Sequence, residues 1–136
     1  MATQYFGERI KRNEDPRLLT GQALFVDDVN LPGMLHVAFL RSPFAHASLT
    51  GFDASLARQR AGVVAVYAAA DLGDYWRTGP LLVSPPPIAG IRFNERTQPI
   101  LAREKIRHLG EPIAAVVADS RYLAEDALAD IRVDYE

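Results

Sequence analysis

The chain has 136 residues, of which 49% are hydrophobic and 24% charged, and its formal net charge is −2. This length suits one domain, and the composition is that of a globular protein. The near-neutral charge excludes strong electrostatic attraction to nucleic acid or to anionic membranes. The chain has no cysteine, which excludes disulfides, thiolate metal sites and iron–sulfur ligation by its own thiolates.

Targeting and membrane segments are not visible in the sequence. Residues 1–15 are polar and lack the apolar core of a signal peptide. No window reaches the apolar length of a membrane span. We therefore expect a cytoplasmic protein.

The first part of the chain predicts a polar arm followed by strands. Residues 1–21 are polar and end in turn-forming residues, so we expect an arm on the surface of a single domain formed by residues 22–136. A short strand is expected at Leu24–Val26. The segment Met34–Arg41 is almost continuously apolar, which is typical of a strand covered on both faces. Residues 47–52 are expected to continue in extended form.

A short helix and a further strand are expected next. Asp53 suits the N-cap of a helix over Ala54–Arg60, because its carboxylate accepts free amide protons of the first turn. Gly62 suits the left-handed position that often follows a helix. The valine-rich segment Val63–Ala68 predicts a strand, and residues 71–72 predict the start of a helical turn.

Residues 73–99 predict a long irregular loop, because they hold five prolines and three glycines without a sustained period. Such a loop inside a compact domain is uncommon. Two interpretations stay open, namely contact with a partner or substrate channel and a plain surface loop. Trp76, next to Tyr75, is interpreted as an anchor of the loop rather than as a stacking platform for a ligand.

The last third predicts two strands, a helix and a final strand. Residues 100–108 and 113–118 flank Gly110-Glu111-Pro112 and predict a hairpin-like corner. A helix capped by Ser120 is expected to run to Asp130. Residues 131–136 alternate between apolar and charged, which indicates a half-buried strand. The elements together predict an α+β (mixed α/β) fold with at least five strands, two short helices and a long proline-rich loop.

The sequence contains no recognisable catalytic or metal-binding pattern. The histidines His36, His46 and His108 share no metal-ligand spacing and are interpreted as structural. Asp27 and Asp28 are adjacent and fit a solvated turn. Walker, G-x-G-x-x-G and G-x-S-x-G motifs are absent. We therefore assign no catalytic, cofactor-binding or metal-ligating residue to this chain.

An ordered set of short segments extends over nearly the whole chain. Its members are Glu14-Asp15-Pro16, Leu19-Thr20-Gly21, Phe25-Val26-Asp27-Asp28, Leu31-Pro32-Gly33-Met34-Leu35-His36, Arg41-Ser42-Pro43-Phe44-Ala45-His46-Ala47, Gly62-Val63-Val64-Ala65-Val66, Pro99-Ile100-Leu101-Ala102, Gly110-Glu111-Pro112-Ile113-Ala114-Ala115-Val116-Val117-Ala118 and Val133-Asp134-Tyr135-Glu136. In this order, the segments resemble the start of large subunits in the aldehyde oxidase, xanthine dehydrogenase and aerobic carbon monoxide dehydrogenase family, the molybdenum hydroxylases.

The resemblance implies an α/β hammerhead fold at the N-terminus of an oxidoreductase that acts on an aldehyde, an N-heterocycle or carbon monoxide with water as oxygen source. It implies a molybdenum–pterin cofactor in the full large subunit, and [2Fe-2S] clusters and FAD in an iron–sulfur subunit and a flavin subunit. In the family, the pterin ligands and the catalytic glutamate lie in later domains. We therefore expect the isolated chain to be structural and interface-forming. The start at Met1 and the end within a strand at Glu136 favour a separate large subunit that continues past this segment.

Arg41, His46 and Glu111 are the candidate interface residues. Gly110 and Pro112 fix a corner at which Glu111 can pair with an arginine or cap backbone amides, and Arg41 suits a bidentate contact with a neighbouring domain. Each candidate either faces a seam between domains or subunits or serves only to specify the fold. Two other functions stay open: a free-standing, non-catalytic module that binds a partner protein, and a small-ligand domain that uses the proline-rich loop.

Overall fold

The computed structural model describes residues 7, 9–79, 83, 86, 88–93 and 97–136. The chain divides into two units, Met1–Met34 and Leu35–Glu136. The expected boundary between an arm of residues 1–21 and a domain of residues 22–136 stays a prediction. The loop of residues 73–99, for which a contact role was expected, lies partly outside the described residues.

The first unit has local structure but no buried side chain among its described residues. Its helical elements are α1 (Asp15–Leu19) and the 3-10 helix η1 (Val26–Asp28). The Phe25 amide donates a hydrogen bond to the Asp28 carboxylate at 2.9 Å. The strand expected at Leu24–Val26 is therefore wrong, because this side-chain contact stabilises a helical turn where the apolar pattern had indicated extended backbone.

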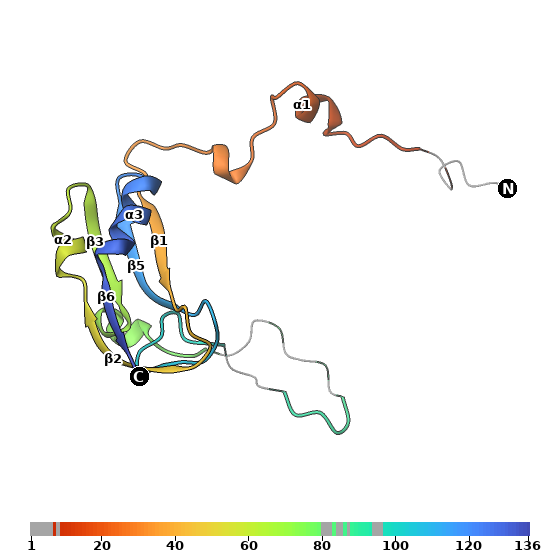
Figure 1. Ribbon diagram of the computed structural model, residues 1–136. Helices are drawn as coiled ribbons and strands as arrows, with labels where there is room; N and C mark the ends of the chain where they lie inside the picture. The colour runs from red at the N-terminus through yellow and green to blue at the C-terminus, as the bar shows by residue number, and fades with distance from the viewer. Residues whose placement is uncertain (1–6, 8, 80–82, 84–85, 87, 94–96) are drawn as a thin grey trace. The chain divides into compact units, whose positions relative to one another are not determined.

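The second unit contains two antiparallel sheets of three strands each, shown in Figure 1. The first sheet has the order β1-β5-β3, with β1 (His36–Arg41), β5 (Pro112–Ala118) and β3 (Val63–Ala68). The second has the order β4-β2-β6, with β4 (Lys105–Ile106), β2 (Ala47–Asp53) and β6 (Arg132–Tyr135). The six strands of the described residues confirm the expectation of at least five.

The helices of the second unit are short and pack on the first sheet. They are α2 (Ser55–Gln59), η2 (Ala69–Tyr75), α3 (Arg121–Ala127) and η3 (Leu128–Asp130). The helix α3 lies against β1 and β5, and α2 lies against β3.

The expected N-cap at Ser120 is confirmed, whereas the one expected at Asp53 is displaced by one residue. The Ser120 hydroxyl accepts the Leu123 amide at 3.3 Å at the start of α3. The Asp53 carboxylate accepts the Ser55 amide at 2.9 Å at the start of α2. The cap residue of α2 itself is Ala54, one position later than expected.

The corner at Gly110–Pro112 does not close a hairpin, which corrects the expectation from the sequence. The strands β4 and β5 flank the corner, but β4 pairs with β2, whereas β5 pairs with β1 and β3. Of residues 100–108, strand geometry is limited to Lys105–Ile106. The physical reason is local, because the Arg107 amide donates to the Glu111 carboxylate instead of to a neighbouring strand.

Small side chains fill the space between the first sheet and its helices. The buried members of this cluster are Ala38, Ala54, Ala57, Val66, Ala114, Val116, Ala118, Ala124, Ala127 and Ile131. Alanine at most of these positions allows the helices to approach the sheet closely at native packing density. A second cluster around β2, β4 and β5 contains Ala47, Ala102, Ile106 and Ile113.

Candidate functional site

The corner at Glu111 is held together inside this chain. Glu111 is only 3% exposed, and its carboxylate accepts hydrogen bonds from the Arg107 amide at 2.5 Å and from the Arg107 guanidinium at 3.2 Å. The backbone of the buried Ser42 donates to the Glu111 carbonyl and accepts from the Gly110 amide, each at 2.9 Å. Glu111 thus pairs with an arginine and caps a backbone amide, and both contacts are ones that the sequence predicted.

Arg41 and His46 are exposed. The Arg41 guanidinium, at the end of β1, donates to the Gly110 carbonyl at 3.0 Å and lies 5.7 Å from the centre of the Phe39 ring. The structure therefore brings Arg41 to the Glu111 corner through Gly110. His46 lies in a bend directly before β2. The expected place of the three residues at a seam stays a prediction.

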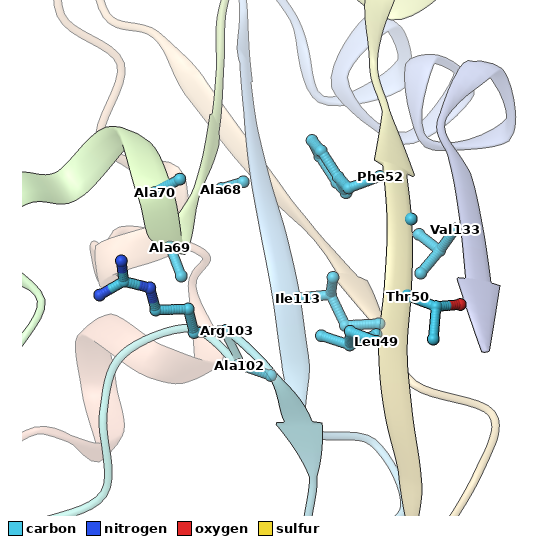
Figure 2. Close-up of a pocket in the computed structure, with 11 residues that line it drawn as sticks. Leu49, Thr50, Phe52, Ala68, Ala69, Ala70, Ala102, Arg103, Ile113 and Val133 are labelled. Carbon is cyan, nitrogen blue, oxygen red and sulfur yellow. The ribbon is translucent and has the colours of Figure 1, made fainter. Parts of the chain in front are cut away.

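A groove of about 330 Å³ lies between β2 and β6 on one side and β5 and η2 on the other (Figure 2). Among the described residues that line it, only Arg103 is charged, and its guanidinium lies 5.3 Å from the centre of the Trp76 ring. The Trp76 indole donates to the Leu101 carbonyl at 2.7 Å, so Trp76 anchors its loop as expected. The wall of the groove is mostly apolar and includes Leu49, Phe52, Ala69, Ala102, Ile113 and Val133.

Sequence reasoning did not find this groove or the role of Arg107. The residues of the groove come from elements far apart in the chain, so no local pattern indicates it. The pairing of Arg107 with Glu111 has a spacing of four residues, which is a signal that a search for nearby opposite charges detects.

The described residues do not fit a metal or pterin site. They contain no group of three or more His, Asp or Glu side chains that could hold a metal ion. The described lining of the groove is mostly apolar, and its polar side chains are those of Arg103 and Thr50, whereas a pterin cofactor is polar and needs several hydrogen-bonding partners. Iron–sulfur clusters are held by cysteine thiolates, and the chain has no cysteine. We therefore derive no cofactor chemistry from this chain's residues.

Among the described residues, no helix combines the length and the apolar character needed to span a membrane.

Among the described residues, three ionisable groups have shifted pKa values, and each shift has a structural cause. The backbone hydrogen bond from Ser55 lowers the pKa of Asp53. The hydrogen bond to Asp130, 2.7 Å long, raises the pKa of Arg60. Burial raises the pKa of Tyr135. The Asp53 contact lies at the start of α2, and the Arg60–Asp130 contact joins α2 to η3.

Within the unit Leu35–Glu136, the described residues leave one face of the first sheet uncovered. Strand register places Phe39, Ala115 and Tyr67 on one rung and Val37, Val117 and Ala65 on the next. We call these six residues the open face. Val37 is 53% exposed, Phe39 41% and Tyr67 43%. Within this unit β1 is covered on one face only, where α2 and α3 contribute to the buried cluster, and the expected cover on its second face stays a prediction.

Comparison with known proteins identifies the family. Residues 20–136 match the sequence model of the aldehyde oxidase and xanthine dehydrogenase, a/b hammerhead domain. The chain belongs to this family. The hammerhead fold that the ordered segments implied is thereby confirmed.

Similar proteins contain this hammerhead domain within much longer chains. The domain is 39% identical to the nicotine 6-hydroxylase large subunit of Paenarthrobacter nicotinovorans, over 96% of this chain and 15% of that protein. It is 43% identical to the carbon monoxide dehydrogenase large chain of Afipia carboxidovorans, over 98% of this chain and 15% of that protein. A crystal structure of Cu,Mo-CO dehydrogenase matches with a TM-score of 0.81 and 40% identity, over 96% of this chain and 15% of that one. The chain therefore spans about 15% of the length of the relatives it matches.

Proposed function

We propose that this chain is the N-terminal hammerhead domain of a molybdenum hydroxylase large subunit, an oxidoreductase that acts on an aldehyde, an N-heterocycle or carbon monoxide with water as oxygen source. The family match over residues 20–136 carries this proposal. The relatives named as a nicotine hydroxylase and a carbon monoxide dehydrogenase support this range of substrates. The domain's own role is structural and interface-forming, since its described polar clusters hold corners and helix starts.

Cofactors and partners follow from this assignment. Other domains of the large subunit hold the molybdenum–pterin cofactor, while an iron–sulfur subunit and a flavin subunit hold the [2Fe-2S] clusters and FAD. The lack of cysteine supports this division, because the chain has no thiolate to offer a cluster. The words large subunit and large chain in the names of the relatives support a multi-subunit enzyme. A cytoplasmic location is part of the same proposal.

The intact mass of the native polypeptide, purified from its source, tests the proposal. We expect a mass several times the 15.0 kDa of this chain, with molybdenum bound to the same polypeptide or its complex. A native polypeptide of 15.0 kDa without molybdenum would contradict the proposal and favour a free-standing module that binds a partner protein.

A further inference from the structure

The open face is apolar at positions where a solvated sheet face is usually polar. An antiparallel sheet with one face in water typically alternates apolar and polar residues along each strand. The strand β6 follows that rule, with Arg132 and Asp134 exposed. All six residues of the open face are apolar instead. A contiguous exposed apolar patch of this kind marks an interaction surface.

The charges that border the open face differ in their pairing. On the β3 side, Arg58 pairs with Asp71 at 3.4 Å, so these two charges satisfy each other. On the β1 side, Arg41 lies over Phe39 and donates to the neutral carbonyl of Gly110. Within the part of the chain that the structure describes, Arg41 forms no ion pair. A guanidinium in this state suits a bidentate contact with a carboxylate from another segment.

We propose that another segment of the same large subunit packs on the open face, through an apolar surface that carries a carboxylate opposite Arg41. This inference rests on the proposed function. The relatives carry the same domain within one polypeptide of which it forms about 15%, and its fold is kept there with a TM-score of 0.81. Permanent interfaces are the more apolar ones, so the apolar character of the open face favours a permanent contact over a transient one. The small share of about 15% that this domain forms of its relatives' chains favours a segment of the same polypeptide as the occupant.

Thiol labelling can test this contact, because each introduced cysteine is quantified on its own peptide and residues 1–136 contain no other cysteine. Three single variants of the full-length large subunit are needed. Val37→Cys lies on the open face, where Val37 is 53% exposed. Val116→Cys lies on the buried face of β5, where Val116 is 0% exposed. Glu125→Cys lies at an exposed position of α3 and serves as the matched control.

The native enzyme is treated with iodoacetamide, and the labelled peptides are quantified by mass spectrometry. We expect Val37→Cys to react at least about tenfold more slowly than Glu125→Cys and at a rate close to that of Val116→Cys, because thiol reactivity follows exposure. The same protection must persist in the large subunit separated from its partner subunits. Molybdenum content similar to that of the unsubstituted enzyme shows that each variant is correctly folded.

Two results would overturn the inference. One is labelling of Val37→Cys at the rate of Glu125→Cys in the folded enzyme. The other is protection that disappears when the partner subunits are removed. That result would show that a partner subunit covers the open face. The intact mass of the labelled polypeptide separates this failure from that of the proposed function. A mass of 15.0 kDa contradicts the proposed function, whereas a long polypeptide with a reactive Val37→Cys contradicts only the contact.

Discussion

The two faces of the β1-β5-β3 sheet are both apolar, but they differ in the exposure of their side chains. The face under α2 and α3 carries small residues that are fully buried, such as Ala114 and Val116. The open face carries Phe39 and Tyr67, which remain about two fifths exposed, beside smaller residues such as Ala65 and Ala115. The apolar content of these strands thus does not tell which face the domain covers itself, whereas the packing of α2 and α3 does.

The largest effect is expected when a charge is placed on each face of β3 in turn. Val66→Asp buries a carboxylate in the helix-covered cluster, where Val66 is 5% exposed, and should cost more than about 4 kcal/mol and prevent folding. Tyr67→Asp, at the next residue, should cost the isolated domain about 1 kcal/mol or less. Circular dichroism and urea unfolding measure both. Equal losses would show that the two faces do not differ within the domain.

A smaller loss of stability is expected at the Glu111 corner. This corner is held by contacts within the domain, so its substitution tests a residue that builds the fold. Glu111→Ala leaves the Arg107 amide without its acceptor and should cost about 2 kcal/mol in the free energy of unfolding. Glu111→Gln keeps one acceptor oxygen and should cost about half as much. Urea unfolding is the measurement. A neutral Glu111→Ala would mean that the corner does not depend on this side chain.

Arg41 should behave in the opposite way, because its partner is expected outside this domain. Arg41→Ala should change the stability of the domain by less than about 0.5 kcal/mol. In the full large subunit the same substitution should cost about 2 kcal/mol, since it leaves a carboxylate of the covering segment unpaired. Arg41→Lys keeps the charge and should recover part of the loss. Thermal unfolding of both proteins checks this, and equal effects in the two would contradict it.

The smallest effect is expected in the pH dependence of stability at acid pH, through Asp53 at the start of α2. The Ser55 amide lowers the pKa of Asp53 below its ordinary value of 3.8. The charged form therefore stabilises the fold above pH 3.8, and this contribution is lost as the pH falls through the lowered pKa. Asp53→Asn should remove that part of the acid dependence. An NMR titration of Asp53 with a midpoint at or above 3.8 would contradict the contact.

Elements set by local chemistry were predictable from the sequence. The strand Val63–Ala68 was predicted with its observed bounds, because its run of valines is short and ends at Gly62. The helix after Ser120 was predictable because its cap is a neighbouring side chain. Prediction failed where one side chain redirected the backbone, as Asp28 does at η1 and Glu111 does before β5.

The site was less predictable than the fold, for a physical reason. The contacts of Glu111 with Arg107 are local in sequence, so the corner could be inferred. The exposure of Phe39 depends on which side of the sheet receives α2 and α3, and the strand sequence is apolar on both sides. The groove joins residues as distant as Leu49 and Val133, and no local pattern contains that information.

Hydroxyl-radical footprinting of the native large subunit tests most directly whether the open face is covered. In this structure Tyr67 is 43% exposed, whereas Tyr122 and Tyr75 are 79% and 83% exposed. With the open face covered by another segment, Tyr67 should be oxidised about tenfold more slowly than Tyr122 and Tyr75, because oxidation follows solvent access. An oxidation rate of Tyr67 near half that of the two reference tyrosines, the ratio of their exposures in this structure, would show that the face is open in the whole protein and would contradict the account.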